Sequence, residues 1–372
     1  MKLVVSRERL TRGLARIQGV LSRKATLPIL SNVLLEARAD GALRIAATDL
    51  DVTFDGQIEA RVEEAGRITV DGKKIYDICR SLPGEEISLS VDDQQRIQLK
   101  CRSSDFVLNG LSATDYPTLP DGSAVGLVPV NGDAFKELIE RTSFSVATDE
   151  SRPNLTGIFF QCAAGNRIRL VSTDGHRLSK GERDASRDDA EIPERDGVIV
   201  PRKGITEIKR MLDEAGAEVQ FGFLDNNFVL ETPEVRLFVR LIDAAFPDYH
   251  QVIPKGTERK VILDRVSFLQ SLKRIAILAS ERTHGVRIEL SSGQMTLGSD
   301  NPDLGRARED ITPESYDGSE LTIAFNSRYL IDILSTLKAE KVEMHLNEAL
   351  SPGIIREHEN EDYLFVVMPM RL

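Results

Sequence analysis

The stretch STDGHRLSK holds the pair of side chains best suited to catalysis, because the carboxylate of Asp174 and the imidazole of His176 could act as an acid–base pair. Two similar stretches, ATDLDVTF and GSDNPDLG, keep the acid as Asp49 and Asp300 but have no histidine. A Thr-Asp-Gly turn between two strands accounts for the acid without any chemistry. We therefore expect that the protein is not an enzyme, and an enzyme that uses this pair is the disfavoured alternative.

Other signatures of reactive or ligand-binding sites are incomplete. The stretch GRITVDGKK is close to a phosphate-binding loop, but five residues separate Gly66 from Gly72 where the P-loop has four. The five histidines lack the spacing of metal ligands. The three cysteines, Cys79, Cys101 and Cys162, are far apart and odd in number, which is typical of buried thiols rather than of disulfides or zinc ligands. We expect no metal and no cofactor.

The charge balance gives two opposing indications. A formal charge of −11 argues against a nucleic-acid partner unless the basic residues are clustered. They are clustered at the start, where the first 24 residues carry seven Lys or Arg and a single acid, Glu8. No signal-peptide pattern opens the chain, and no apolar run approaches the ~18 residues that span a bilayer. The sequence therefore predicts a soluble, cytoplasmic protein with one basic surface.

The basic residues follow the periodicity of helices. At about 100° per residue, the apolar residues of segment 6–21 fall on one side of a helix, and Arg9, Arg12 and Arg16 fall nearly opposite. Basic residues recur in RKGITEIKR (202–210) and in the segment that begins at Arg265, although the segment after Asn131 has mixed charges. One such face is ordinarily a solvated surface, but its recurrence in an acidic chain favours phosphate contacts that leave the bases unread.

The elements that carry these residues recur along the chain. Four landmarks recur in the same order. The first is a polar N-cap before an amphipathic helix, and the second is an acid at the end of a pair of strands. The third is an isoleucine in a helix that follows a further strand, and the fourth is an apolar-Pro pair at the end of the last strand. The acids are 125 and 126 residues apart, the isoleucines 130 and 125, and the prolines 130 and 122. These landmarks are Ser6, Asn131 and Asp264; Asp49, Asp174 and Asp300; Ile78, Ile208 and Ile333; Pro117, Pro247 and Pro369.

The chain is therefore predicted to consist of three homologous domains, over residues 1–126, 127–257 and 258–372. The breaks fall in DGSAVG and PKGTE, where Gly and Pro mark linkers. Each domain consists of two halves, and each half is read as a strand, a helix and three strands. This order predicts an α+β fold with two helices on one face of an antiparallel sheet.

Five motifs together resemble one family over the whole chain: the bacterial DNA sliding clamp, which is the β subunit of DNA polymerase III. The motifs are ATLPILSN (25–32), TDGHRL (173–178), VPRKG (200–204), FPDY (246–249) and VVMPMRL (366–372). The resemblance implies three DNA-clamp domains and a head-to-tail homodimer that forms a ring around duplex DNA, with the helices lining the hole. It also implies a processivity factor, an accessory subunit of the DNA-directed DNA polymerase holoenzyme used in DNA replication.

The partners implied by the resemblance are double-stranded DNA, bound without regard to sequence, the replicative polymerase, a clamp loader and other proteins with short clamp-binding peptides, and no membrane. A protein-interaction scaffold built from three repeats, which binds no DNA, is the alternative. The expected DNA-binding residues are Arg23, Lys24, Lys73, Arg152, Arg202 and Lys203. The expected dimer interface is Lys74, Ile78 and Leu82 against Ile277 and Leu278.

The chain end is expected to form part of a partner site. YLFVVMPMRL stays apolar almost to the last residue, where chain ends are normally polar and frayed. The resemblance implies that this strand edges a hydrophobic cleft between the second and third domains, which takes short apolar peptides from partner proteins. The expected cleft residues are Leu155, Thr173, Gly175, His176, Arg177, Leu178, Pro247, Val252, Asn326, Tyr329, Val366, Val367, Met368, Pro369, Met370 and Arg371.

Overall fold

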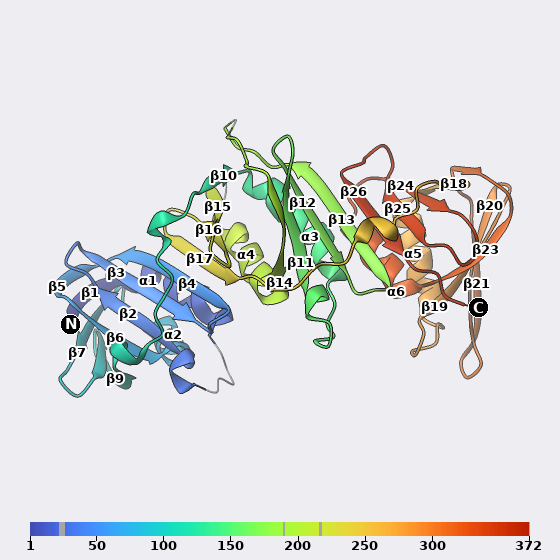
Figure 1. The fold of residues 1–372 in the computed structure, drawn as a ribbon. Coiled ribbons are helices and arrows are strands. Elements are labelled where there is room, and N and C mark those ends of the chain that lie inside the picture. The colour runs from blue at the N-terminus through green and yellow to red at the C-terminus, as the bar shows by residue number, and fades with distance from the viewer. Residues whose placement is uncertain (22–26, 189, 216–217, 372) are drawn as a thin grey trace. The chain divides into compact units, whose positions relative to one another are not determined.

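The computed structural model describes residues 1–21, 27–188, 190–215 and 218–371. Its antiparallel strands outnumber its helices, and the predicted order of a strand, a helix and three strands occurs twice in each of the three repeats (Figure 1). This confirms the α+β prediction. The first repeat contains β1 (Lys2–Ser6), α1 (Arg7–Arg16), β2 (Asn32–Ala37), β3 (Ala42–Thr48), β4 (Val52–Glu59), β5 (Arg61–Glu64), β6 (Gly66–Asp71), α2 (Gly72–Ser81), β7 (Glu86–Val91), β8 (Arg96–Cys101) and β9 (Ser104–Leu111).

The other two repeats follow the same order, and the first and third each have one short extra strand between their halves, β5 and β22. The second contains β10 (Val128–Val130), α3 (Gly132–Thr142), β11 (Gly157–Ala163), β12 (Arg167–Thr173), β13 (Arg177–Asp184), β14 (Arg195–Pro201), α4 (Arg202–Ala215), β15 (Val219–Leu224), β16 (Asn227–Glu231) and β17 (Val235–Arg240). The third contains β18 (Arg259–Asp264), α5 (Arg265–Ala276), β19 (Gly285–Ser291), β20 (Gln294–Asn301), β21 (Gly305–Ile311), β22 (Ser315–Asp317), β23 (Leu321–Asn326), α6 (Ser327–Thr336), β24 (Lys341–Leu346), β25 (Gly353–Glu357) and β26 (Tyr363–Val367).

Local sequence signals start the helices where the pattern predicted. The Asp264 carboxylate accepts a 2.7 Å hydrogen bond from the Ser267 amide at the start of α5, and Asn326 caps α6 in the same way. Such a cap stabilises a helix by about 1 kcal/mol. Ser6 precedes α1 without a side-chain cap bond. The apolar face of α1 is buried at Leu10 and Leu14, so its predicted orientation is confirmed.

The chain divides into two compact units that do not coincide with single repeats. Unit 1 comprises Met1–Asp133, Ser186–Glu191 and Lys203–Leu241. Its 13-stranded sheet runs β10-β15-β16-β17-β4-β3-β2-β6-β9-β8-β7-β1-β5. Strand β17 pairs antiparallel with β4 from Val235↔Gly56 to Val239↔Val52, so the sheet of the first repeat continues into strands of the second. Helix α1 packs against β4 and α2.

Unit 2 comprises Ala134–Ala185, Ile192–Arg202 and Ile242–Leu372. It has a nine-stranded sheet, β14-β11-β12-β13-β26-β25-β24-β18-β22, and a four-stranded sheet, β21-β20-β19-β23. The last strand, β26, lies between β13 and β25. It therefore has hydrogen-bonding partners on both sides, and Phe365, Val366 and Val367 are buried. This position accounts for the apolar character of the chain almost to its end.

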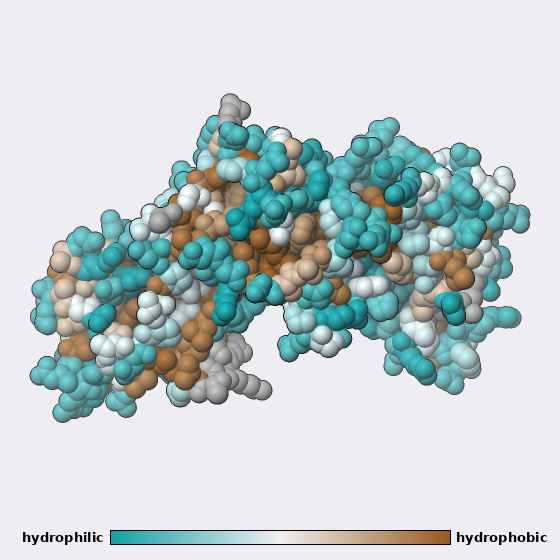
Figure 2. All heavy atoms as spheres, viewed as in Figure 1, coloured by the Kyte–Doolittle hydropathy of each residue, from teal (hydrophilic) through white to brown (hydrophobic). Residues whose placement is uncertain are grey.

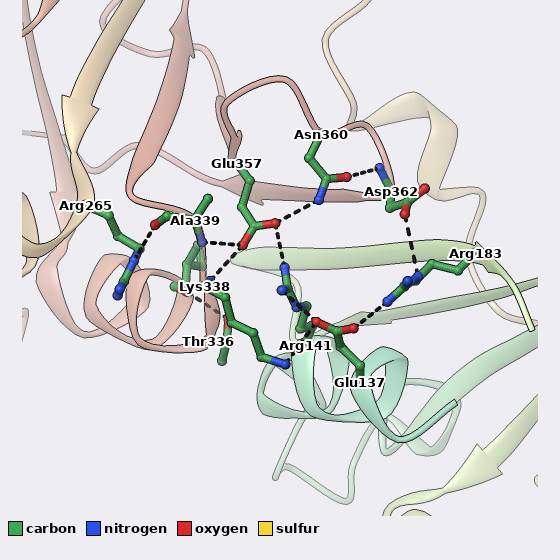
Figure 3. Close-up of polar contacts among 11 residues, drawn as sticks. Glu137, Arg141, Arg183, Arg265, Thr336, Lys338, Ala339, Glu357, Asn360 and Asp362 are labelled. Carbon is green, nitrogen blue, oxygen red and sulfur yellow. Dashed lines mark hydrogen bonds and ion pairs between the residues drawn. The ribbon is translucent and has the colours of Figure 1, made fainter. Parts of the chain in front are cut away.

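A buried ionic network ties α3 to the strands of the third repeat (Figure 3). The Arg141 guanidinium, whose side chain is 5% exposed, lies 2.9 Å from a Glu357 carboxylate oxygen and 2.8 Å from one of Glu137. It also lies over the ring of Tyr363 in β26, 4.3 Å from the centroid. Burial opposes ionisation of Glu357, but the bonds from Arg141 and from two backbone amides outweigh it and lower its pKa. A buried charge with this many partners fixes the position of α3 against β25.

Candidate functional site

The turn between β12 and β13 is built by Asp174, not by an acid–base pair. One Asp174 carboxylate oxygen accepts hydrogen bonds from the amides of His176 (2.9 Å) and Arg177 (3.1 Å). Gly175 takes a φ of +91°, a left-handed conformation that favours glycine. Its amide donates to the Thr173 hydroxyl, which itself donates to the Arg177 carbonyl. The His176 side chain is exposed, and no bond among the described residues joins it to the Asp174 carboxylate.

Arg177 connects this turn to α6. Its guanidinium donates to Asp174 (3.0 Å), to Asp332 of α6 (2.6 Å) and to the Phe144 carbonyl (2.7 Å). The same group lies 4.5 Å from the ring centroid of Tyr329. Because three acceptors hold the guanidinium in place, Arg177 positions the turn and the aromatic ring, rather than offering a free charge.

An apolar cluster lies beside the turn. Val171, Leu178, Tyr249 and Val366 are buried together. Partly buried side chains pack around them; these are Phe159, Phe246, Val252, Ile253 and Leu364. Phe159 stacks on Phe246 with ring centroids 5.1 Å apart. The segment after β17 therefore folds back over β11, β12, β13 and β26 and presents partly exposed apolar groups.

The C-terminal tail, residues 368–371, is held on both sides. The Met368 amide donates to the His176 carbonyl (2.9 Å), and the Met370 amide donates to the Ala324 carbonyl of β23 (2.7 Å). The tail thus leads from the nine-stranded sheet to the four-stranded one. Met368, Pro369 and Met370 are partly buried, and Arg371 is exposed. We call the turn 173–178, the apolar cluster and the C-terminal tail together the tail site.

Most of the predicted cleft residues meet at the tail site. The turn, Leu178, Val252, Val366, Val367 and the tail are joined by the contacts above, and Tyr329 is joined to them through Arg177. Pro247 is exposed directly after Phe246, and Asn326 caps the helix that carries Tyr329. Leu155 is buried in the single turn 153–155 before β11.

Sequence reasoning missed the aromatic members of the cluster. From FPDY it took only Pro247, whereas Phe246 and Tyr249 both pack in the cluster with Phe159. Burial raises the pKa of Tyr249 above its usual value. The two aromatic residues of FPDY could have indicated this cluster. Two aromatic rings directly before a predicted linker need an apolar surface to pack on.

The predicted DNA-binding residues have different surroundings. Arg23 and Lys24 lie outside the described residues. Lys73 is exposed in the first turn of α2, Arg152 is exposed before β11, and Arg202 is exposed at the start of α4. The structure shows Lys203 half-buried, paired with the Asp49 carboxylate and donating to the Val20 carbonyl at 3.2 Å.

The predicted dimer residues differ in exposure. Ile277 follows α5 and is 73% exposed, and Leu278 and Ile78 are partly buried. Lys74 is exposed, whereas Leu82 is only 4% exposed within one chain. The apolar residues Phe106 and Val107 of β9 are also exposed, and they are not among the residues predicted from the sequence.

Three models of the DNA polymerase III beta subunit match the chain: the N-terminal domain over residues 1–120, the central domain over 129–248 and the C-terminal domain over 250–371. The chain belongs to the DNA polymerase III beta-subunit family. It is 37% identical over 373 residues to the beta sliding clamp of Pseudomonas putida, with 100% of both chains covered. The sliding clamp of Bacillus subtilis superposes with a TM-score of 0.94 at 27% identity, covering 100% of this chain and 99% of that one. A Pseudomonas aeruginosa sliding clamp bound to griselimycin gives a TM-score of 0.91 at 36% identity, with both chains fully covered.

Family membership confirms the resemblance and the role predicted from it. The protein is a processivity factor, an accessory subunit of the DNA polymerase III holoenzyme and not a catalyst. The scaffold alternative is not favoured, because full-length relatives are named sliding clamps. The domain boundaries and the individual site residues stay predictions.

Several other properties can be read from the described residues. The three cysteines are buried, and burial raises the pKa of Cys79 to about 12 and that of Cys162 to about 11. No helix within the described ranges is long and apolar enough to cross a bilayer. In the same part of the chain, no three His, Cys, Asp or Glu side chains are grouped to hold a metal ion. The face seen in Figure 2 is mostly hydrophilic, with smaller apolar areas between.

Proposed function

We propose that two copies of the chain associate head to tail into a ring around duplex DNA, and that the tail site takes short apolar peptides from the polymerase, the clamp loader and other replication proteins. The observation that carries the proposal is the tail site itself. Apolar side chains there stay partly exposed, as a site for a short apolar peptide requires, and the hydrogen bonds of Met368 and Met370 hold the tail in place beside them. Met368 and Met370 suit a site with several partners, because methionine adapts its shape.

Two strand edges support the head-to-tail dimer. In β9, residues 104–109 pair only with β8, because β6 pairs just with Gly110 and Leu111. Strand β21 ends the four-stranded sheet of unit 2. Free strand edges favour pairing with another chain, and a contact between two different edges closes a ring if the rotation permits.

The exposed apolar residues fit these edges. Phe106 and Val107 are on β9, and Ile277 follows α5, which packs against β21. Of the apolar residues proposed for the interface, Ile277 has the most surface to bury, and Leu278 and Ile78 are partly buried within one chain. Leu82 contributes little new buried area, because it is already covered within one chain.

Duplex DNA is proposed to pass along the helices and to contact Lys73, Arg152 and Arg202, together with Arg23, Lys24 and Lys203. Contacts to phosphates alone carry no sequence information and weaken steeply with salt. Both properties suit a ring that retains DNA by enclosing it and must still slide.

The decisive experiment combines mass and topology. Light scattering after size-exclusion chromatography should give twice the chain mass, and protein loaded by the clamp loader should stay on nicked circular DNA and leave linear DNA by its ends. Lys73→Glu with Arg152→Glu and Arg202→Glu should reduce retention and flatten its salt dependence without changing the mass. A monomer, or equal retention on both DNA forms, would contradict the ring.

A further inference from the structure

The basic face of α1 is occupied by carboxylates of its own chain. Arg12 pairs with Glu8 one turn earlier, at 2.9 Å. Arg9 pairs with Glu59 at the end of β4. Both arginines are more than half exposed, so these are surface ion pairs on the side of the helix away from the core.

Arg16 has two carboxylate partners from distant parts of unit 1. Its guanidinium lies 2.7 Å from Glu214 in the last turn of α4 and 2.8 Å from Glu234 in the turn before β17. The Arg16 side chain is 18% exposed. Burial opposes the charge of Arg16, but the two bonds outweigh it and raise its pKa.

The same arrangement continues along α4. Lys203 pairs with Asp49, and Arg210 lies 3.5 Å from Glu207 and also donates to the Ala15 carbonyl of α1. Helices α1 and α4 therefore touch, and their basic side chains form one row in unit 1. In these contacts, the partners of Arg9, Arg12, Arg16, Lys203 and Arg210 are acids and backbone carbonyls.

A hollow of about 670 Å³ lies beside the α1 part of this row. Arg9, Arg12 and Arg16 line it, and so do Glu59 and Glu234. Its arginines and acids are therefore within reach of the same incoming group. A phosphate that enters the hollow would meet each arginine with a carboxylate already bound to it.

We propose that Glu59, Glu214 and Glu234 set the strength of the DNA contact by competing with phosphates for Arg9 and Arg16. This inference rests on the proposed passage of DNA along the helices. The exposed Arg9–Glu59 pair is weak, so a phosphate can replace this carboxylate. Arg16 is mostly covered, but its two carboxylate partners are 40% and 57% exposed, so a phosphate competes with them from the solvent side. The carboxylate then stays close to the arginine and takes it back when the phosphate moves on. Each contact becomes an exchange of partners, which keeps binding weak and lets DNA slide.

A comparison with a row of arginines that has no acids beside it shows what the acids contribute. A row of arginines without acids would gain affinity with every phosphate, and log affinity would fall with log salt by about 0.9 for each contact. Such a ring would be slowed by the DNA that it encloses. Acids at the row lower the effective number of contacts while they keep the arginines ordered for a brief encounter.

The test replaces the three acids by their amides, as Glu59→Gln, Glu214→Gln and Glu234→Gln. The control variant carries Glu63→Gln, Glu258→Gln and Glu314→Gln, which change the net charge equally but pair with Lys2, Arg259 and Lys341, outside α1 and α4. Affinity for a short fluorescent duplex is measured by anisotropy between 50 and 300 mM salt. Diffusion of the loaded ring along stretched DNA is followed by single-molecule tracking.

The proposal expects the triple variant to bind the duplex roughly threefold to thirtyfold more tightly than the control variant, with a steeper salt dependence and slower diffusion. Glu59 is 82% exposed, so Glu59→Gln alone cannot fail through misfolding and should move all three readouts in the same direction. If the triple variant and its control bind and diffuse alike, the competition is refuted while DNA binding stands. If the unaltered protein binds no duplex at 50 mM salt, the DNA role fails and this inference fails with it.

Discussion

Deleting the last three residues separates the two possible roles of the C-terminal tail. Strand β26 ends at Val367, so the deletion leaves the nine-stranded sheet intact, and Met368 keeps its bond to the His176 carbonyl. The deletion removes the 2.7 Å bond from the Met370 amide to the Ala324 carbonyl. It also removes the Met370 side chain, which packs so close to Gly285 that a Cβ placed on this glycine would lie 3.9 Å from the Met370 sulfur. One such bond contributes about 1 kcal/mol, so the melting temperature should fall by only a few degrees.

The effect on peptide binding should be larger. An apolar anchor that loses one wall of its pocket loses about 2 kcal/mol, which is roughly thirtyfold in affinity. The assay is calorimetric titration of a short Gln- and Leu-containing polymerase tail peptide into the full-length and truncated proteins. Arg371→Ala is the matched control, because it keeps Met370 and its backbone bond while removing an exposed side chain. Equal affinities with equal melting temperatures would show that the tail neither forms a wall of the peptide site nor stabilises the fold.

Three further predictions concern the dimer, the pH dependence and the ionic network. Ile277→Asp with Leu278→Asp should give monomers by analytical ultracentrifugation, because each unpaired buried charge costs several kcal/mol, roughly; a dimeric double variant would remove this interface. Burial opposes the charge of Glu182, but its basic neighbours outweigh it and lower its pKa from 4.5 to about 2, so it should stabilise the fold by on the order of 2 kcal/mol above pH 4.5 and lose this effect as the pH falls towards 2. In denaturant unfolding, the unaltered protein should be more stable than Glu182→Gln above pH 4.5, and this difference in the free energy of unfolding should disappear as the pH falls towards 2. A difference that is the same at all pH values would contradict the prediction. Arg141→Met should cost about 3 to 5 kcal/mol by leaving the buried Glu357 carboxylate without its cationic partner. Adding Glu357→Gln, which removes the charge but keeps an oxygen that accepts from the Lys338 and Ala339 amides, should restore much of the loss in the same measurement; no recovery would mean that packing, not charge, is what Arg141 supplies.

The repeated elements could be predicted because their signals are local. The apolar face of α1, the cap at Asp264 and the paired strands all follow from spacing within about ten residues, and the structure has them. The joining of sheets between repeats could not be predicted in this way. Strand β17 adds to β4, and β26 adds to β13, through backbone hydrogen bonds, which no side-chain pattern specifies.

The long-range ion pairs of the basic face could not be predicted from the sequence either, because their partners are far apart along the chain. Arg16 was correctly placed on the outer side of α1, but its partners Glu214 and Glu234 come from 198 and 218 residues away. Helix periodicity shows where a charge points and not what it meets. The prediction of a basic face was therefore incomplete, because acids from another repeat neutralise part of it.

The recurring acid has a structural role that the repeat pattern only partly indicated. Asp49 accepts hydrogen bonds from the amides of Asp51 and Val52, just as Asp174 does in the next repeat. In the third repeat this role passes from Asp300 to Asn301, whose side chain accepts from the two amides that follow Pro302. The turn predicted at Asp174 is therefore confirmed, Asp49 has the same role in the first repeat, and the third repeat uses the neighbour of its acid.

Asp49 links its turn to helix α4 through its second carboxylate oxygen. While one oxygen of Asp49 holds the turn, the other pairs with Lys203 of α4. The turn also places Leu50 at a φ of 80°, a strained conformation for a leucine, so the bonds around it must hold it there. Changing Lys203 would disturb this turn as well as any DNA contact. A loss of DNA retention in Lys203→Glu could therefore come from the disturbed turn or from a lost DNA contact. Lys73 is exposed and has no carboxylate within 4 Å among the described residues, so the same loss in Lys73→Glu would point to the DNA contact alone.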